Sequence, residues 1–367
     1  MKSLVNLAEY SQVKTAHFLR EKLEEKGIDC YLSYVSDPEV RALRTRVQIK
    51  GEDVENAVRI MLGIKESLGK NIEDLDPSAP AYKILVPTNF SKGSENAAYY
   101  ALHLAKQIQA EMKILHVYEN PLSGVDINKT STFENYALST ILEVEENAKT
   151  GLMEFMNRIK TYGTKHGLGE IQMLPASIMG RVVNRISEIA EVYQPDFLVL
   201  GTEGKKEGSR SVLGGLGMNM IQKLELPLFA VPEAFIPHEH QKMNILYATD
   251  FNEKDHNSLN RLLHLLSPFD IEITCIHIET EPDLQMEERM DELNFFLARN
   301  YRSHRIQCRL IEDKDVFHGI QQYTDSNKIN LLSFTTRKKH IFEKLFRPNL
   351  FKKILQEARV PILIFPS

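Results

Sequence analysis

Tyr82-Lys-Ile-Leu-Val-Pro-Thr-Asn-Phe90 recurs later in the chain as Met243-Asn-Ile-Leu-Tyr-Ala-Thr-Asp-Phe251. At the same offset, Lys113-Ile-Leu-His-Val117 falls on Thr274-Cys-Ile-His-Ile278. Two separate apolar segments agree on one register, which predicts an internal repeat. Two further pairs match at smaller offsets, which differ from each other by one residue, so the second copy is shorter than the first: Phe197–Thr202 with Asn330–Thr335, and Pro227–Pro232 with Pro361–Pro366.

Each copy alternates short apolar runs with longer amphipathic segments. Ile84–Val86 is an uninterrupted apolar run of the kind found in strands buried on both faces. Asn89 and Ser91 can cap the helix that follows. Because strands separated by helices of this length form right-handed crossovers, the sheet should be parallel. We therefore predict an α/β fold with two tandem five-stranded parallel-sheet sandwiches.

The segment before the linker at 67–81 does not belong to the repeat. Its apolar pattern gives the order strand, helix, strand, strand, helix, and Gly27 stands where a glycine commonly ends a helix. This order predicts a small ferredoxin-like α+β domain with the following elements: Leu4–Leu7, Val13–Leu23, Cys30–Tyr34, Arg46–Lys50 and a helix from Val54.

Two stretches rich in proline and polar residues separate the predicted domains. Leu68–Ala81 contains Pro77 and Pro80, and Glu233–Gln241 contains Pro237. The predicted organisation is a small domain at residues 1–66, a linker at 67–81, the first repeat at 82–235, a linker at 236–241 and the second repeat at 242–367.

Composition excludes several classes of protein. The 367 residues carry 50 acidic and 45 basic side chains, a net charge of −5 that gives no support to nonspecific nucleic-acid binding. No apolar run approaches the roughly 18 to 20 residues of a membrane span, and the first residues lack a signal-peptide core. Cys30, Cys275 and Cys308 form no CxxC pair, so we expect neither a disulfide framework nor a thiolate zinc site. These features predict a cytoplasmic protein without a membrane partner.

One glycine-rich segment has the composition of a phosphate-binding loop. The strand Phe197–Leu200 runs into Gly201-Thr-Glu-Gly204, and Gly214-Gly215 follow before an amphipathic segment. Clustered glycines between a strand and a helix let several N–H groups approach a phosphate chain. The segment is neither a GxxxxGK[ST] loop nor a GxGxxG loop. Taken alone, the glycines could equally serve only to turn the chain.

The pattern G-x2-G-x9-G, the opening I-L-V-P-T-N-F-S, the His-Val strand end and the closing L-P-L-x-x-V-P together resemble the universal stress protein family. The resemblance covers Tyr82–Pro232 and, more weakly, Met243–Ser367. It implies two tandem sandwiches of the adenine nucleotide alpha hydrolase-like fold. Residues 1–66 are similar, more faintly, to a small PII-like domain family of prokaryotic signalling proteins.

The resemblance implies binding of ATP, ADP or AMP, with a divalent metal allowed alongside the nucleotide. Two positions depart from the family pattern: Asn89 replaces the usual Asp, and Gly215 replaces a Ser or Thr. We expect these changes to weaken binding without abolishing it. The implied site has an adenine and ribose end, a residue packing on the base, and a phosphate loop: Pro87, Thr88 and Asn89; Val117; and Gly201, Gly204, Gly214, Gly215 and Leu216.

The second repeat departs further from the pattern. It keeps Asp250, but the positions aligned with the four glycines are Phe334, Arg337, Arg347 and Pro348. We expect no family-type phosphate binding there, since the glycines are gone and proline has no N–H. The basic side chains between 337 and 347 could still attract an anion, or could simply form a solvated face.

Other candidate groups predict no catalytic chemistry. His116 and His277 occupy matched strand ends and are expected to be packing histidines, and His238-Glu-His240 lies in a linker without a third metal ligand nearby. No nucleophile and base are brought together by a motif, so we do not expect an enzyme, although slow ATP hydrolysis is left open. The leading hypothesis is a stress-response or signalling protein that senses adenine nucleotide in its first repeat. The alternative is a nucleotide-free scaffold that binds a protein partner, which the sequence does not identify.

The closing strand of each repeat predicts how the repeats associate. Leu226–Val231 and Val360–Phe365 are apolar segments that would be association hazards as bare edges. Members of the family resembled here commonly pair this strand across a two-fold axis. We therefore expect Phe229 and Val231 to meet Ile362–Phe365 within one chain, as an intramolecular pseudo-dimer.

Overall fold

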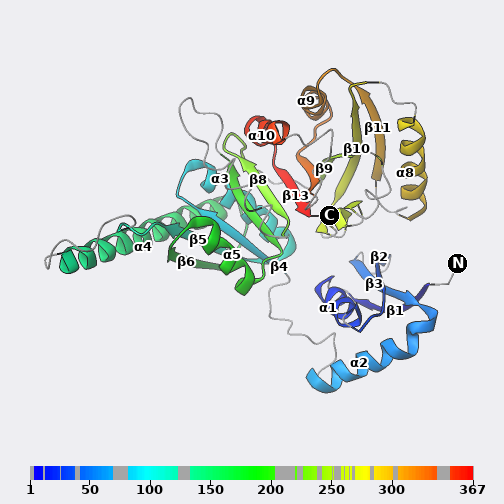
Figure 1. The fold of residues 1–367 in the computed structure, drawn as a ribbon, viewed down its shortest axis with the longest axis horizontal. Helices are drawn as coiled ribbons and strands as arrows, with labels where there is room; N and C mark the ends of the chain where they lie inside the picture. The colour runs from blue at the N-terminus through cyan, green and yellow to red at the C-terminus, as the bar shows by residue number, and fades with distance from the viewer. Residues whose placement is uncertain are drawn as a thin grey trace. The chain divides into compact units, whose positions relative to one another are not determined.

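The computed structural model falls into two compact units, Met1–Ala81 and Tyr82–Ser367 (Figure 1). It describes residues 4–10, 13–24, 26–37, 42–68, 82–122, 133–202, 220, 226–237, 242–249, 251, 258–259, 261–263, 265–266, 269–281, 285–300, 305–336 and 348–366. None of the helices in these ranges combines the length and apolar character needed to cross a bilayer.

The first unit is an antiparallel sheet with the strand order β1-β3-β2, packed against two helices. Its core contains Leu19 and Leu23 of α1, Val47 and Ile49 of β3, and Ala57 of α2, all fully buried. The elements follow the order predicted from sequence, and the likeness to PII-like domains stays a prediction. The bounds are β1 (Leu4–Tyr10), α1 (Val13–Glu24), β2 (Cys30–Asp37), β3 (Ala42–Lys50), a short 3-10 turn (Gly51–Asp53) and α2 (Val54–Leu68).

The second unit alternates strands and helices throughout its described length. Its first half contains β4 (Tyr82–Thr88), α3 (Lys92–Ile108), β5 (Ala110–Tyr118), α4 (Phe133–Lys165), β6 (Met173–Met179), α5 (Val182–Tyr193), β7 (Phe197–Thr202) and β8 (Leu228–Pro232). Its second half contains β9 (Met243–Ala248), β10 (Ile271–Glu279), α8 (Met286–Asn300), β11 (Arg305–Glu312), α9 (Val316–Ser326), β12 (Leu331–Thr336), α10 (Pro348–Glu357) and β13 (Ile362–Pro366).

These strands form one ten-stranded sheet in the order β11-β10-β9-β12-β13-β8-β7-β4-β5-β6. Within each half all pairs are parallel, and the strand order is the same when counted from each end. The α/β class predicted from sequence is confirmed. The halves join at an antiparallel pair, in which Phe229 of β8 lies opposite Leu363 of β13, and Ala230 opposite Ile362.

The strand register corrects one alignment made from sequence. Leu198 pairs with Leu228 and Leu332 pairs with Ile362, which shifts β12 by one position relative to the sequence alignment with β7. The same one-position shift is seen in the pairs Ile84–Phe197 and Ile245–Leu331. Gly201 therefore corresponds to Thr335, and Phe334 corresponds to Leu200.

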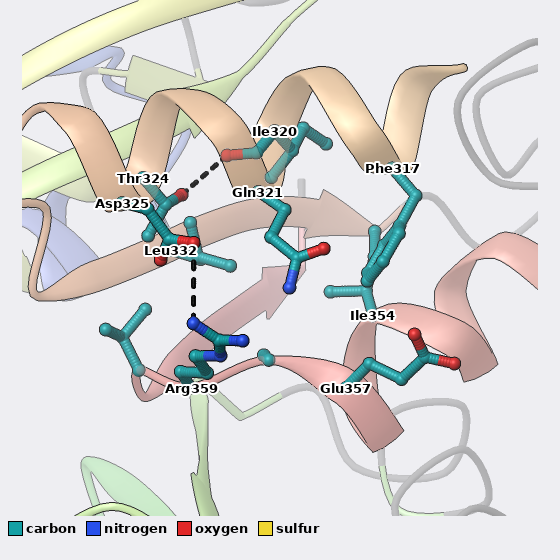
Figure 2. Close-up of a pocket in the computed structure, with 11 residues that line it drawn as sticks. Phe317, Ile320, Gln321, Thr324, Asp325, Leu332, Ile354, Glu357 and Arg359 are labelled. Carbon is teal, nitrogen blue, oxygen red and sulfur yellow. Dashed lines mark hydrogen bonds and ion pairs between the residues drawn. The ribbon is translucent and has the colours of Figure 1, made fainter.

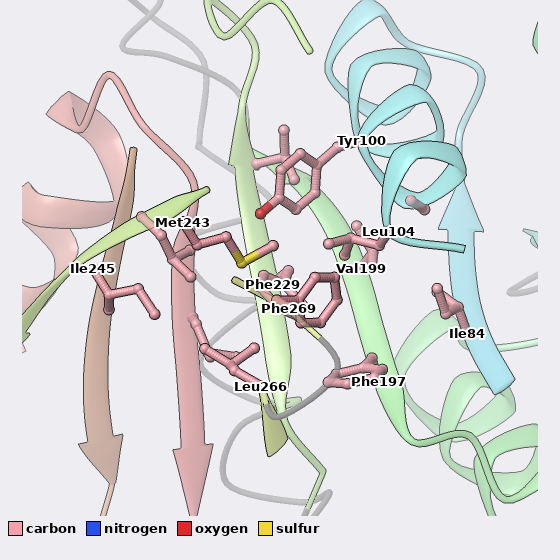
Figure 3. Close-up of a cluster of buried hydrophobic side chains, with 14 of the residues drawn as sticks. Ile84, Tyr100, Leu104, Phe197, Val199, Phe229, Met243, Ile245, Leu266 and Phe269 are labelled. Carbon is pink, nitrogen blue, oxygen red and sulfur yellow. The ribbon is translucent and has the colours of Figure 1, made fainter. Parts of the chain in front are cut away.

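A continuous apolar core crosses the junction between the halves (Figure 3). Phe229 of β8 packs near Met243, Leu266 and Phe269 from the second half, with Tyr100 of α3 beside it. Phe229 is fully buried, and its ring lies 5.8 Å from that of Tyr100. Because one core serves both halves, we expect residues 82–367 to unfold as a unit.

The predicted cap of the first helix in this unit is present. Ser91 is the N-cap of α3, and its hydroxyl accepts a hydrogen bond from the Ser94 N–H at 3.3 Å. The helix ends at Gln109, which adopts the left-handed conformation with φ of 52°. Because α3 follows β4 directly in the chain, the amino end of α3 lies at the edge of the sheet where β4 ends.

Candidate functional site

The carboxyl ends of β4, β5 and β7 meet at one edge of the sheet. Thr88, the last residue of β4, is paired with His116 of β5, and β7 runs parallel to β4 on its other side. In open parallel sheets, ligands bind at this edge, outside the carboxyl ends of the strands. The edge is therefore the candidate site.

The Thr88 hydroxyl is used inside the protein. Its Oγ1 accepts from the Phe90 N–H at 3.0 Å and lies 3.0 Å from the Ser94 hydroxyl, which donates to the Ser91 carbonyl oxygen. Thr88 is also buried, with 6% of its surface exposed. Its side chain fixes the turn between β4 and α3, so a ligand would meet the backbone of this turn.

Asn89 is exposed at the same edge. Its Oδ1 accepts a hydrogen bond from the Ser91 N–H at 3.2 Å, so the oxygen that the resemblance assigns to the nucleotide already supports the start of α3. A second lone pair and the amide NH₂ remain chemically able to bind a ligand.

Phe90 takes an unusual backbone conformation, with φ of 63°. Its ring stacks on His116 at 4.1 Å, and a Cβ built on Gly151 of α4 would lie 2.9 Å from the Phe90 ring. His116 Nδ1 lies 2.9 Å from the Thr88 carbonyl oxygen, which can only accept, so Nδ1 donates. The stack and the hydrogen bond hold the turn in place.

The second half repeats this turn. Phe251 has φ of 51°, its N–H donates to Thr249 Oγ1 at 2.9 Å, and His277 Nδ1 lies 3.0 Å from the Thr249 carbonyl oxygen. Both histidines therefore have the packing role expected from sequence.

Gly201, at the end of β7, touches the amino end of α3. A Cβ built on Gly201 would lie 2.2 Å from the Gly93 carbonyl oxygen and 2.7 Å from the Ser94 nitrogen. Any side chain at this position would displace backbone. The close backbone contact therefore explains why this residue is a glycine, independently of any role in holding a phosphate.

The segment that follows β8 forms hydrogen bonds to both β7 and α3. The Glu233 N–H donates to the Thr202 carbonyl oxygen at 3.0 Å. Asn96 of α3, which is buried, donates from Nδ2 to the carbonyl oxygens of Glu233 and Phe235, at 2.6 and 3.0 Å. Sequence patterns had not identified Asn96, because its partners lie far from it along the chain.

A charged group accompanies the first turns of α3. Burial acts to raise the pKa of Glu95, but the hydrogen bond from Tyr99 and the charges of Lys92 and Arg158 outweigh it and hold that pKa below its usual value. Glu95 is thus ionised at neutral pH and links α3 to α4.

Five of the nine predicted site residues lie at or near this edge. Pro87 and Thr88 are buried, Asn89 is exposed, Val117 is half-buried near the end of β5, and Gly201 is the residue before the last of β7. The phosphate loop proper lies outside the described residues, so its role stays a prediction: Gly204, Gly214, Gly215 and Leu216.

The corresponding strands of the second half carry a buried hydroxyl pair near their carboxyl ends. Tyr247, which corresponds to Val86, places its hydroxyl 2.8 Å from that of Thr335, and both residues are buried. Thr335 occupies the position of Gly201 by strand register. Asp250 and residues 337–347 lie outside the described part of the chain.

A pocket in the second half lies between α9 and α10 and contains none of the predicted site residues (Figure 2). Its floor is apolar, with Phe317, Ile320 and Leu332, and the ion pair between Arg359 and Asp325 at 3.6 Å lies at its margin. No group of three or more His, Cys, Asp or Glu side chains in the described ranges could hold a metal ion.

Comparison with known proteins identifies a family for the first half. Residues 81–232 match the model of the Universal stress protein family, which places a universal stress protein domain there. A curated universal stress protein of Methanocaldococcus jannaschii is 27% identical over 150 residues, covering 41% of this chain and 81% of that protein.

A solved structure shares the fold. The crystal structure of a universal stress protein from Archaeoglobus fulgidus covers 77% of this chain and 98% of its own, with a TM-score of 0.54 and 16% identity. At this identity the likeness concerns the fold alone. A universal stress protein solved in complex with cAMP covers 41% of this chain and 96% of its own, with a TM-score of 0.30 and 18% identity.

Proposed function

We propose that the chain binds ATP or a related adenine nucleotide at the carboxyl edge of β4, β5 and β7, and acts in stress response or signalling. One observation carries the proposal: Gly201, the first residue of the G-x2-G-x9-G segment, lies directly against the amino end of α3. The glycine-rich segment therefore leaves the sheet next to the amino end of a helix, and both belong to the residues that match the universal stress protein family.

The donor chemistry of this edge suits a nucleotide. The amino end of the 17-residue helix α3 has a positive potential, and glycine N–H groups at the end of β7 would add donors for the phosphates. The exposed amide of Asn89 would face the ribose or base, and half-buried Val117 would offer an apolar contact for the base. A divalent metal would come with the phosphates.

We also propose that the second half is a degenerate repeat that binds no nucleotide. Its strand order and its Thr249-Phe251-His277 turn match those of the first half, which supports the interpretation as a tandem universal stress protein. Thr335 stands where Gly201 makes its close contact with the start of α3, so the second half lacks the glycine from which the proposed phosphate loop begins. The antiparallel pair of β8 and β13 would then make the chain an intramolecular pseudo-dimer.

A nucleotide-free scaffold is the second candidate, and one observation favours it. Thr88 and Gly201 both have structural explanations inside the protein, so neither residue requires a ligand. Slow ATP hydrolysis, the protein partner, the PII-like domain and the cytoplasmic location stay predictions from the sequence.

A nucleotide analysis separates these two functions. The full chain is purified, incubated with excess ATP, desalted and denatured, and the released nucleotides are separated by chromatography. We expect ATP, ADP or AMP in near-equimolar amount with the chain. If no adenine nucleotide is retained, the scaffold interpretation holds and the proposed function is wrong.

A further inference from the structure

The fold brings together two cysteines that the sequence separates. Cys275 of β10 and Cys308 of β11 are directly opposite each other in a parallel strand pair. β10 and β11 lie side by side, next to α8 (Figure 1). All three cysteines are free thiols in this structure, and the strand register adds that two of them are neighbours.

The spacing of this pair suits a disulfide. Neighbouring strands of a sheet lie about 4.8 Å apart, and directly opposed residues point to the same face. A disulfide accepts Cα separations of about 4.4 to 6.8 Å. Both cysteines are buried in the same apolar cluster as Met286, Leu293 and Leu297 of α8. The two thiols therefore share one enclosed space between the sheet and α8.

Cys308 is the cysteine that an oxidant reaches first. It lies on β11, at the end of the sheet order, and 7% of its surface is exposed, whereas Cys275 is fully buried on the inner strand β10. An edge strand is paired on one side only, so it opens more readily than an inner strand. The Cys308 N–H donates to Asn294 Oδ1 of α8 at 3.3 Å, which ties this part of β11 to the helix.

We propose that Cys275 and Cys308 are a reversible oxidation site for hydroperoxides. The Cys308 sulfur attacks one peroxide oxygen, the O–O bond breaks, and a sulfenic acid forms while the other oxygen leaves as water. The Cys275 sulfur then attacks the Cys308 sulfur, the S–S bond forms, the S–O bond breaks, and the hydroxyl leaves as water with the remaining thiol proton. Two thiols are oxidised, and one hydroperoxide is reduced to two waters when it is hydrogen peroxide.

The disulfide is reversible, because exchange with a reducing thiol breaks the S–S bond and restores both thiols. The third cysteine differs: burial and the nearby carboxylate of Glu24 raise the pKa of Cys30 to about 11, so little of it is thiolate at neutral pH. Cys30 is therefore the matched control.

The test uses the full chain treated with a small excess of hydrogen peroxide. We expect the intact mass to fall by two hydrogen atoms, a peptide linking Cys275 to Cys308 to appear in the digest, and dithiothreitol to restore both thiols. Cys275→Ala and Cys308→Ala should each abolish the linked peptide. Cys30→Ala should leave its yield unchanged.

The peptide map of the unaltered chain decides the matter even if a variant folds poorly. Retention of all three thiols at peroxide concentrations that oxidise a model thiol would overturn the proposal. So would thiol loss that maps to Cys30 or to links between chains. The site does not depend on nucleotide binding, so its outcome is independent of the proposed function.

Discussion

Gly201 at the end of β7 lies against Gly93 in the first turn of α3, with room for no side chain between them. Strand and helix come from segments far apart in the sequence, yet their backbones meet at the edge where the candidate site lies. The contact sets where the glycine-rich segment leaves the sheet. The two halves differ at this point, because Thr335 stands in the equivalent position of β12.

Gly201→Ala should destabilise the chain by about 1 to 3 kcal/mol, because the added Cβ would push on the Gly93 backbone. Urea unfolding followed by circular dichroism measures this difference. Gly163→Ala is the matched control, since its Cβ would make an ordinary contact with Leu102 at 3.8 Å within helix α4. That variant should be neutral or more stable. Equal free energies of unfolding for the two variants would contradict this prediction, because they would mean that the Gly93 backbone moves aside without loss of stability.

Asn89→Asp should tighten nucleotide binding. The carboxylate keeps the acceptor that Ser91 uses and adds a charge that can accept from the ribose or base. The gain is at most that of a hydrogen bond to a charged group, about 1.5 to 3 kcal/mol. Calorimetric titration with ATP measures it.

Asn120→Asp is the control for that substitution. Asn120 forms the same kind of turn, with Oδ1 accepting from the Leu122 N–H at 2.9 Å, and it belongs to no predicted site. It should leave affinity unchanged. Weaker binding in Asn89→Asp would mean that the amide donates to the ligand, and would contradict this prediction.

Val231→Glu should disrupt the joint core of the two halves. Val231 is fully buried on β8, in the cluster that contains Leu363 and Phe365 of β13, so the carboxylate would be buried without a partner. We expect a loss of roughly 3 to 5 kcal/mol and association between chains through β8 and β13. Val192→Glu, at a position 85% exposed, is the control. Chemical denaturation measures the stability, and size-exclusion chromatography measures the association. Equal stability and equal elution of the two variants would contradict this prediction.

The α/β class and its parallel strands could be predicted from sequence because apolar runs such as Ile84–Val86 alternate with amphipathic segments at a regular spacing. The one-position error in aligning β7 with β12 arose because Thr335 and Thr336 are neighbours, and either can be matched to Thr202. Only the hydrogen-bond register of the sheet distinguishes them.

The candidate site was predictable in its location and less so in its chemistry. Strand ends and a glycine segment indicate an edge, but whether Thr88 binds a ligand or its own turn depends on three-dimensional geometry. Its hydroxyl meets Ser94 because the turn folds back on α3. The pairing of Cys275 with Cys308 was hidden for the same reason, since residues on separate strands become neighbours only through the sheet.

Calorimetric titration of ATP into the full chain measures whether the first half alone binds nucleotide. We predict one site per chain. Gly214→Val should remove it by blocking the phosphates, whereas Gly63→Val, whose Cβ would meet nothing within 4 Å, should retain it. Two equal sites per chain, or unchanged affinity in Gly214→Val, would show that the glycine segment of the first half is not the binding site.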